Sequence, residues 1–272
     1  MKKYRFKNTV VKSLVIIILA NFSLVAHGEQ SASAIMLKVD ERYTGDTIRS
    51  NATLILIDKK DRQRVRELTL FGIENEEVEK SIIYFRSPSD VKNTAYMSFD
   101  WKDKAKEDDS WLYLPALQKV RRVAASDESG AFMGSDFSYA DINGLEYDDF
   151  EYSMEKASEK VDGYDCWVIK SLPKNDKAIK ETGYTSSISW VRKDAMLVVK
   201  SIINVKRGKR TKYFIAKDIE KIEGIWTAQT LQMVTTKNGK REHSSVFKIR
   251  NVKYNQDVDE SMFDTDAMQR GL

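Results

Sequence analysis

The chain has 272 residues, with 45 Lys and Arg against 41 Asp and Glu and a formal net charge of +4. Five of the cations lie within residues 1–28, which contain no acidic residue, so the rest of the chain is close to neutral. A near-neutral chain lacks the concentrated positive field that binding to nucleic acid requires, and we expect no nucleic-acid partner. The 42% hydrophobic and 10% aromatic content is enough for a sizeable folded core.

Residues 1–28 have the pattern of a secretory signal peptide. A positive region (residues 1–12) precedes an apolar stretch of 14 residues (13–26), which is shorter than the ~20 residues that span a bilayer. Small residues follow, and we expect cleavage after Gly28, with Ala34 as the second choice; an uncleaved anchor is the alternative. No cysteine lies near either position. The pattern therefore predicts an exported, unlipidated periplasmic protein.

The remainder of the chain is dominated by strand patterns. A helical pattern over residues 35–48 comes first, and residues 52–58 are then rich in β-branched side chains. Residues 94–101 alternate apolar and polar side chains with a period of two, as a half-buried strand does. Asn238-Gly239, between two alternating runs, predicts a tight hairpin. We count roughly eleven strands and expect one mainly β domain (residues 29–272) whose antiparallel sheet curls into a barrel or an open half-barrel.

One loop, residues 125–144, is too apolar to be solvated although its glycines and polar residues break any strand. A wide curled sheet does not easily fill its own concavity, so we expect this loop to plug or cover an apolar cavity that suits a lipid-like ligand. Ordinary core packing is the alternative for most of the large apolar side chains. The residues that we expect to line or cover the cavity are Met97, Phe99, Trp111, Tyr113, Leu114, Phe132, Met133, Phe137 and Tyr139.

The inventory of reactive side chains is poor. Beyond residue 28 the chain has one histidine, His243, and one cysteine, Cys166, which cannot form a zinc site alone or close an intrachain disulfide. We expect His243 to be a surface histidine and Cys166 a buried free thiol. Asp136 and Asp141 are candidates for paired acid–base chemistry, but such clusters arise by chance in a chain with 41 acidic residues. We therefore expect a protein that is not an enzyme and that has no catalytic residues, no metal and no cofactor.

The segment from residue 111 to residue 142 carries a specific family resemblance. It contains WLYLPALQKVRR (residues 111–122) and FMGSDFSYAD (residues 132–141). Both blocks resemble the signature of the bacterial LolA-like proteins called "outer membrane lipoprotein-sorting protein". The blocks KVDERY (residues 38–43) and GYDCW (residues 163–167) occur in the same order, so the resemblance spans essentially the whole chain after the signal peptide.

The resemblance implies an unclosed antiparallel half-barrel whose hydrophobic concave face is covered by helices and a loop. It also implies a monomeric periplasmic protein that binds acyl chains of lipoproteins or of another lipid and moves them toward the outer membrane. The chain is longer than the small lipoprotein carrier, and its longer relatives resemble companions of RND-type transporters. An inner-membrane transporter of that type is therefore an expected partner, and a non-carrying adaptor that docks to an envelope transporter complex is the alternative.

Arg121 and Arg122 lie at the end of a predicted strand, immediately before the apolar loop. Adjacent positions on a strand point to opposite faces, so at most one of the two can face the concavity. Guanidinium groups pair bidentately with carboxylate and phosphate, and we expect this pair to bind a lipid headgroup or an acidic partner. The alternative is that both arginines form salt bridges with nearby acids such as Asp127, Glu128 or Asp136 and hold the loop in place.

Overall fold

The computed structural model describes residues 30–272, so the predicted signal peptide lies outside the described residues. Within that range the chain forms thirteen antiparallel strands and four α-helices. The strands are β1 (Thr47–Ile57), β2 (Gln63–Glu74), β3 (Val78–Ser87), β4 (Ala95–Trp101), β5 (Asp109–Leu114), β6 (Lys119–Arg122), β7 (Phe150–Val161), β8 (Tyr164–Pro173), β9 (Tyr184–Arg192), β10 (Leu197–Val205), β11 (Arg210–Ile222), β12 (Ile225–Lys237) and β13 (Lys240–Tyr254). The helices are α1 (Ala32–Asp40), α2 (Tyr139–Asn143), α3 (Asp176–Thr182) and α4 (Thr265–Arg270).

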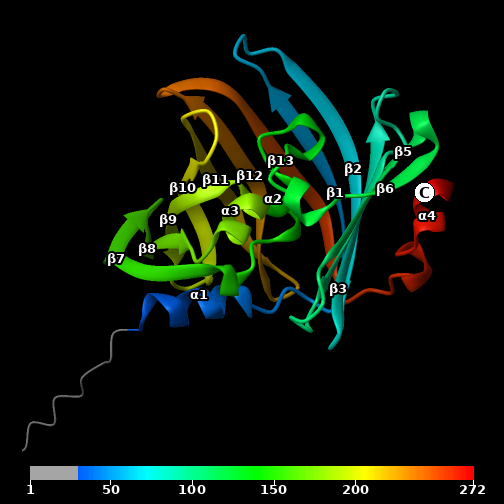
Figure 1. Cartoon of the computed structure of the whole chain (residues 1–272). Coiled ribbons are helices and arrows are strands. Elements are labelled where there is room, and N and C mark those ends of the chain that lie inside the picture. The colour runs from blue at the N-terminus through cyan, green and yellow to red at the C-terminus, as the bar shows by residue number, and fades with distance from the viewer. Residues whose placement is uncertain (1–29) are drawn as a thin grey trace, which may run out of the picture. The chain divides into compact units, whose positions relative to one another are not determined.

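All thirteen strands belong to one sheet in the order β6-β5-β4-β3-β2-β1-β13-β12-β11-β10-β9-β8-β7. The first and last strands of that order, β6 and β7, do not pair with each other, so the sheet is not closed into a barrel. The sheet curls around α2 and α3, whereas α4 lies against its other side (Figure 1). This confirms the mainly β, unclosed half-barrel that the sequence predicted, with two strands more than our rough count.

Tight hairpins keep consecutive strands adjacent. Asp162-Gly163 joins β7 to β8 and Asn238-Gly239 joins β12 to β13, and all four residues have positive φ, between 49° and 87°. Such a pair of positive φ values is characteristic of the hairpin turn whose twist matches that of the flanking strands. The hairpin that the sequence predicted at Asn238-Gly239 is confirmed.

The sheet has an apolar cluster on each face. We call inner the face that is covered by the loop of residues 125–144, and outer the face that is covered by the C-terminal segment. Every strand from β4 to β9 along the sheet order contributes a side chain to the inner cluster. On the outer face of β2–β6 the cover comes from Phe263 and Met268, both of which are buried. In this half of the sheet, the loop of residues 125–144 therefore packs on the inner face and the C-terminal segment packs on the outer face.

The helices differ in detail from the sequence prediction. α1 begins after Ser31, whose Oγ accepts a hydrogen bond from Ala34 N, so it starts earlier than the predicted helical pattern, and it ends at Asp40. Near the C-terminus a single 3-10 turn, Glu260–Met262, precedes α4. No helix within residues 30–272 has the length and apolar character needed to cross a membrane.

Candidate functional site

The inner face of the sheet is filled by aromatic side chains of residues 125–144, which we call the plug loop. Phe132 is fully buried, and its ring lies 5.4 Å from that of Tyr96 and 6.0 Å from that of Phe85, measured between centroids. Phe137 packs edge-on against Phe247 of β13 at 5.2 Å. The loop thus places its own apolar groups where a curled sheet would otherwise leave a concavity.

The plug loop has a local structure that presents these two rings on the same side. Phe132 N donates a hydrogen bond to Phe137 O at 2.8 Å, which closes a tight turn. Within the turn Met133 has a φ of 49° and Gly134 a φ of 76°, and the second value favours glycine because an L side chain is strained there. Ser138 then caps α2, in a capping box with Asp141.

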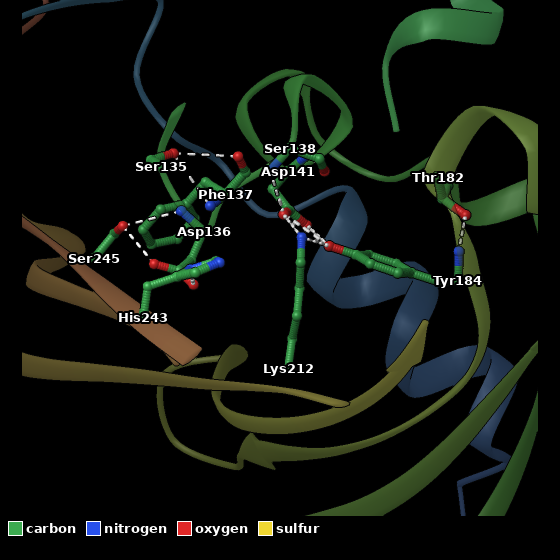
Figure 2. Close-up of polar contacts among 10 residues, drawn as sticks. All are labelled: Ser135, Asp136, Phe137, Ser138, Asp141, Thr182, Tyr184, Lys212, His243 and Ser245. Carbon is green, nitrogen blue, oxygen red and sulfur yellow. Dashed lines mark hydrogen bonds and ion pairs between the residues drawn. The ribbon is translucent and has the colours of Figure 1, made fainter. Parts of the chain in front are cut away.

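Asp136 ties the loop to β13. The carboxylate side chain is 1% exposed, accepts a hydrogen bond from Ser245 Oγ at 2.6 Å and pairs with His243 Nδ1 (Figure 2). The hydrogen bond with Asp136 raises the pKa of His243 above its ordinary value. The prediction that His243 is a surface histidine is confirmed, since its side chain is 47% exposed, but the ring is also paired with a buried carboxylate. This pairing could not be predicted, because Asp136 and His243 are far apart in the chain.

Asp141 ties the other end of the loop to β9 and β11. It accepts a hydrogen bond from Tyr184 OH at 2.7 Å and forms an ion pair with Lys212 Nζ at 3.3 Å, and Lys212 also donates to Tyr184 OH at 2.9 Å (Figure 2). The side chains of Asp141 and Lys212 are only 9% and 13% exposed. Burial, followed by the nearby Asp141 charge, raises the pKa of Tyr184. A third tie, from Arg66 Nη1 to Met133 O at 2.5 Å, holds the turn itself.

A pocket of about 510 Å³ opens beside the Asp136 tie. Its walls are the adjoining ends of β1 and β2, Gly134 and Asp136 of the plug loop, and the start of β13 at His243. Arg62 and Arg64 contribute to the same lining and are exposed, which places the pocket at the surface. Arg62 is paired with Asp58.

The structure divides the predicted cavity residues between the two faces. Phe132, Met133, Phe137 and Tyr139 belong to the inner cluster. Leu114 is half-buried on β5 and belongs to neither cluster. The residues that lie on the outer face under the C-terminal segment are Met97, Phe99, Trp111 and Tyr113. Our grouping of all nine residues around one cavity is corrected in this respect.

The predicted cavity residues are divided between the two faces because side chains alternate along a strand. On β4 and β5 the inner face is formed by Tyr96 and Leu112, and their chain neighbours necessarily point the other way. Inner-face residues that the sequence analysis did not single out include Leu54, Leu68 and Met233, all of them buried. Phe247 and Ile249 of β13 also belong to the inner cluster, and the period of two in that strand is the sequence signal that could have identified them.

Arg121 and Arg122 do not take part in the plug-loop contacts. Arg122 forms an exposed ion pair with Asp109 at 2.5 Å, and Arg121, opposite Leu112 in the register, is exposed. Glu128, one of the acids expected to hold them, instead accepts hydrogen bonds from Ser110 and Asn143. The two arginines lie on edge strand β6, on opposite faces as strand geometry requires.

One group of carboxylates could hold a cation. Oxygens of Asp100, Asp108 and Glu146 lie within 4.8 Å of one another. Lys104 pairs with Glu146 at 2.5 Å, so a side-chain ammonium group already supplies positive charge there. Burial and the charge of Glu146 raise the pKa of Asp100 to about 6.

The fold and the covered apolar face define a class: an open antiparallel half-barrel whose concave side is closed by a loop of the same chain. Comparison with solved structures gives the same class. A domain from Vibrio parahaemolyticus described as an outer membrane lipoprotein-sorting protein aligns with a TM-score of 0.77 at 25% identity, covering 88% of this chain and 98% of that chain. A DUF1329 family protein from Desulfovibrio piger aligns with a TM-score of 0.77 at 28% identity, covering 87% and 97%.

A LolA superfamily protein from Nitrosomonas europaea shares the fold, with a TM-score of 0.65 at 17% identity over 88% of this chain and 99% of that chain. A family model described only as "uncharacterized protein" matches residues 77–270, well over half of the chain. A search of curated proteins gave no match. The chain belongs to the family that this model describes, and its structure is similar to those of the lipoprotein-sorting domain and the DUF1329 protein.

Proposed function

We propose that this protein is a non-catalytic periplasmic carrier that binds the acyl chains of a lipoprotein or another lipid on the inner face of its sheet, in the place that Phe132 and Phe137 occupy. The observation that carries the proposal is the way this face is covered. It is apolar across most of the sheet, and the middle of its cover is the plug loop, which is held by a few polar ties. One structural neighbour described above, the domain from Vibrio parahaemolyticus, is described as a lipoprotein-sorting protein, which supports the same proposal.

The exchange of plug for cargo is energetically feasible. Exposing two buried phenylalanine side chains costs about 3–6 kcal/mol, at about 1.5–3 kcal/mol each. Burying an acyl chain contributes about 0.8 kcal/mol for each methylene group, so roughly four to eight methylenes balance that cost. Any longer acyl chain leaves a surplus that can break the polar ties of the loop.

The proposed location rests on the signal-peptide pattern of residues 1–28, which would leave residues 29–272 as the mature domain. A carrier of this kind would take cargo from the inner membrane, and an RND-type transporter is the partner that the family resemblance suggests. The alternative is an adaptor that carries no lipid. It is favoured by one observation, the unpaired edge strand β6, which presents Arg121 and Arg122 to solvent.

The carrier proposal is tested by lipid extraction. Mature protein is incubated with vesicles that contain a fluorescent diacyl lipid, the vesicles are sedimented, and lipid in the soluble protein fraction is measured. We expect stoichiometric lipid in that fraction. Protein that takes up no lipid, while remaining folded by far-UV circular dichroism, would overturn the proposal.

Two variants on β2 give a matched control. Leu70 and Ile73 are both half-buried aliphatic residues, but Leu70 packs on the inner cluster and Ile73 on the outer one. Leu70→Glu should reduce lipid uptake, because it puts a charge on the proposed binding face. Ile73→Glu should cost comparable stability and leave uptake near that of the wild type. Equal effects of the two substitutions would contradict the assignment of the inner face.

A further inference from the structure

A lysine and a histidine on the inner face are each covered by a carboxylate of the plug loop. Lys212 on β11 pairs with Asp141, and His243 on β13 pairs with Asp136 (Figure 2). In the register of the sheet, Thr235 of β12 lies directly opposite Lys212 on one side and His243 on the other. The three residues therefore form a row across three neighbouring strands, and directly opposed residues point to the same face.

This row is unusual for the floor of an apolar plug. Within residues 30–272, Thr235 Oγ1 is the buried side-chain polar atom that has no hydrogen-bond partner, and Thr235 is 3% exposed. A buried hydroxyl without a partner is costly, and native proteins seldom leave one. The Thr235 hydroxyl lies between Lys212 and His243 in the row, and it is free to donate a hydrogen bond to a ligand or to accept one.

Buried carboxylates are also an energetically costly way to hold the plug loop against the sheet. Burying an ion pair costs desolvation that its Coulomb attraction only partly offsets, and well-packed apolar side chains often stabilise as much or more. The side chain of Asp136 is 1% exposed and that of Asp141 is 9% exposed. When the loop leaves, Lys212 loses its counter-charge and His243 loses its hydrogen-bond partner, at a site where the neighbouring side chains are apolar. An anion in place of the two carboxylates would restore the pairing.

We propose that Lys212, Thr235 and His243 form a binding strip for the anionic headgroup of the cargo, a carboxylate or a phosphate, and that Asp141 and Asp136 occupy this strip as internal substitutes while the loop is closed. The inference rests on the proposed function and adds the chemical class of the ligand to it. Strands lie about 4.8 Å apart, so the backbones of Lys212 and His243 are about 10 Å apart, a span that a long lysine side chain and a headgroup bridge together.

The pocket at the edge of the plug loop provides an approach to the strip. It is lined by His243 and Asp136, and Arg64 extends the positive charge toward solvent. A headgroup entering there meets His243 first, while the acyl chains can follow the apolar face vacated by Phe137. The plug loop and the cargo would then compete for both parts of the site, the rings for the chains and the carboxylates for the headgroup.

The inference is tested by competition. The neutral dye N-phenyl-1-naphthylamine is bound to the mature protein near pH 7 and displaced by dodecanoate, by dodecyl phosphate or by the neutral dodecyl maltoside, and the ratio of neutral to anionic apparent Kd is the readout. We expect the wild type to prefer an anionic competitor; which of the two it prefers distinguishes a fatty-acid headgroup from a phosphate headgroup. Lys212→Met should lower the preference by about tenfold, because a hydrogen bond to a charged group is lost.

Asp141→Asn and Lys217→Met make the test decisive. Asp141→Asn breaks the same tie as Lys212→Met but leaves the cation, so it should raise the preference for anions. Lys217 is an exposed lysine on the same strand, and its replacement should leave the preference unchanged. If Lys212→Met and Asp141→Asn shift all three competitors equally, the ion pair is only a lid contact and the headgroup strip is refuted while the carrier function stands. If no competitor displaces the dye and vesicles yield no lipid, the carrier function itself fails.

Discussion

Replacing Phe132 by Ala should tighten ligand binding even though it destabilises the protein. Phe132 is fully buried and contacts the rings of Phe85, Tyr96 and Tyr139. Replacement of a core phenylalanine by alanine costs about 3–5 kcal/mol. If the plug loop leaves when cargo binds, this cost falls on the closed form alone. At about 1.4 kcal/mol for each factor of ten, the population of the closed form falls by a factor of roughly 10² to 4 × 10³ relative to the open form.

A ligand that binds the open form gains affinity as the open fraction grows, until the open form dominates. The dissociation constant of N-phenyl-1-naphthylamine should therefore fall by about a hundredfold in Phe132→Ala. The urea midpoint should also fall. Phe263→Ala is the control: Phe263 is 6% exposed but lies on the outer face. It should lower the midpoint and leave the dissociation constant unchanged. Weaker binding in Phe132→Ala would show that the ring contacts the ligand, and would refute the competition between plug and cargo.

Three further predictions concern charged groups. The pKa of His243 is raised by Asp136, so the stabilising contribution of the pair is fully present below about pH 6.5 and is lost as pH rises through the raised value; the difference in unfolding free energy between wild type and His243→Asn should shrink from about pH 6 to about pH 9, and a constant difference would contradict the pairing. Burial raises the pKa of Asp100 to about 6, so its charge destabilises the fold above that pH; Asp100→Asn should raise the urea midpoint at about pH 8 and leave it near the wild-type value at about pH 4, whereas equal midpoints at both would count against this assignment. The ion pair of Arg122 with Asp109 is exposed, so Arg122→Ala should change the unfolding free energy by less than about 1 kcal/mol, and a larger loss in chemical denaturation would disprove this.

Local sequence signals were sufficient for the architecture. Strand patterns, the two hairpin turns with positive φ and the apolar composition of residues 125–144 each depend on neighbours in the chain. Together they predicted an antiparallel sheet curled into a barrel or an open half-barrel with a loop packed against it, and the structure has the open form and the packed loop. The family signature around residues 111–142 predicted the same fold independently.

The composition of the site could not be derived in the same way. A period of two shows that Met97 shares a face with Phe99, but it does not show which face the plug loop covers, and here both faces of β4 are covered. The pairing of Asp136 with His243 depends on the curl of the whole sheet, which brings together residues separated by 107 positions. Long-range register, rather than local propensity, decides which polar groups meet beneath the loop.

The most direct test of the account is native mass spectrometry of the protein purified from the periplasm under mild conditions. The account predicts a mass equal to that of the mature chain plus one lipid or lipopeptide, which dissociates on activation and can then be identified. It also predicts that Leu70→Glu protein carries less of this adduct than Ile73→Glu protein. A clean apo mass for the wild type, accompanied by a stable protein partner, would contradict the carrier function and favour the adaptor.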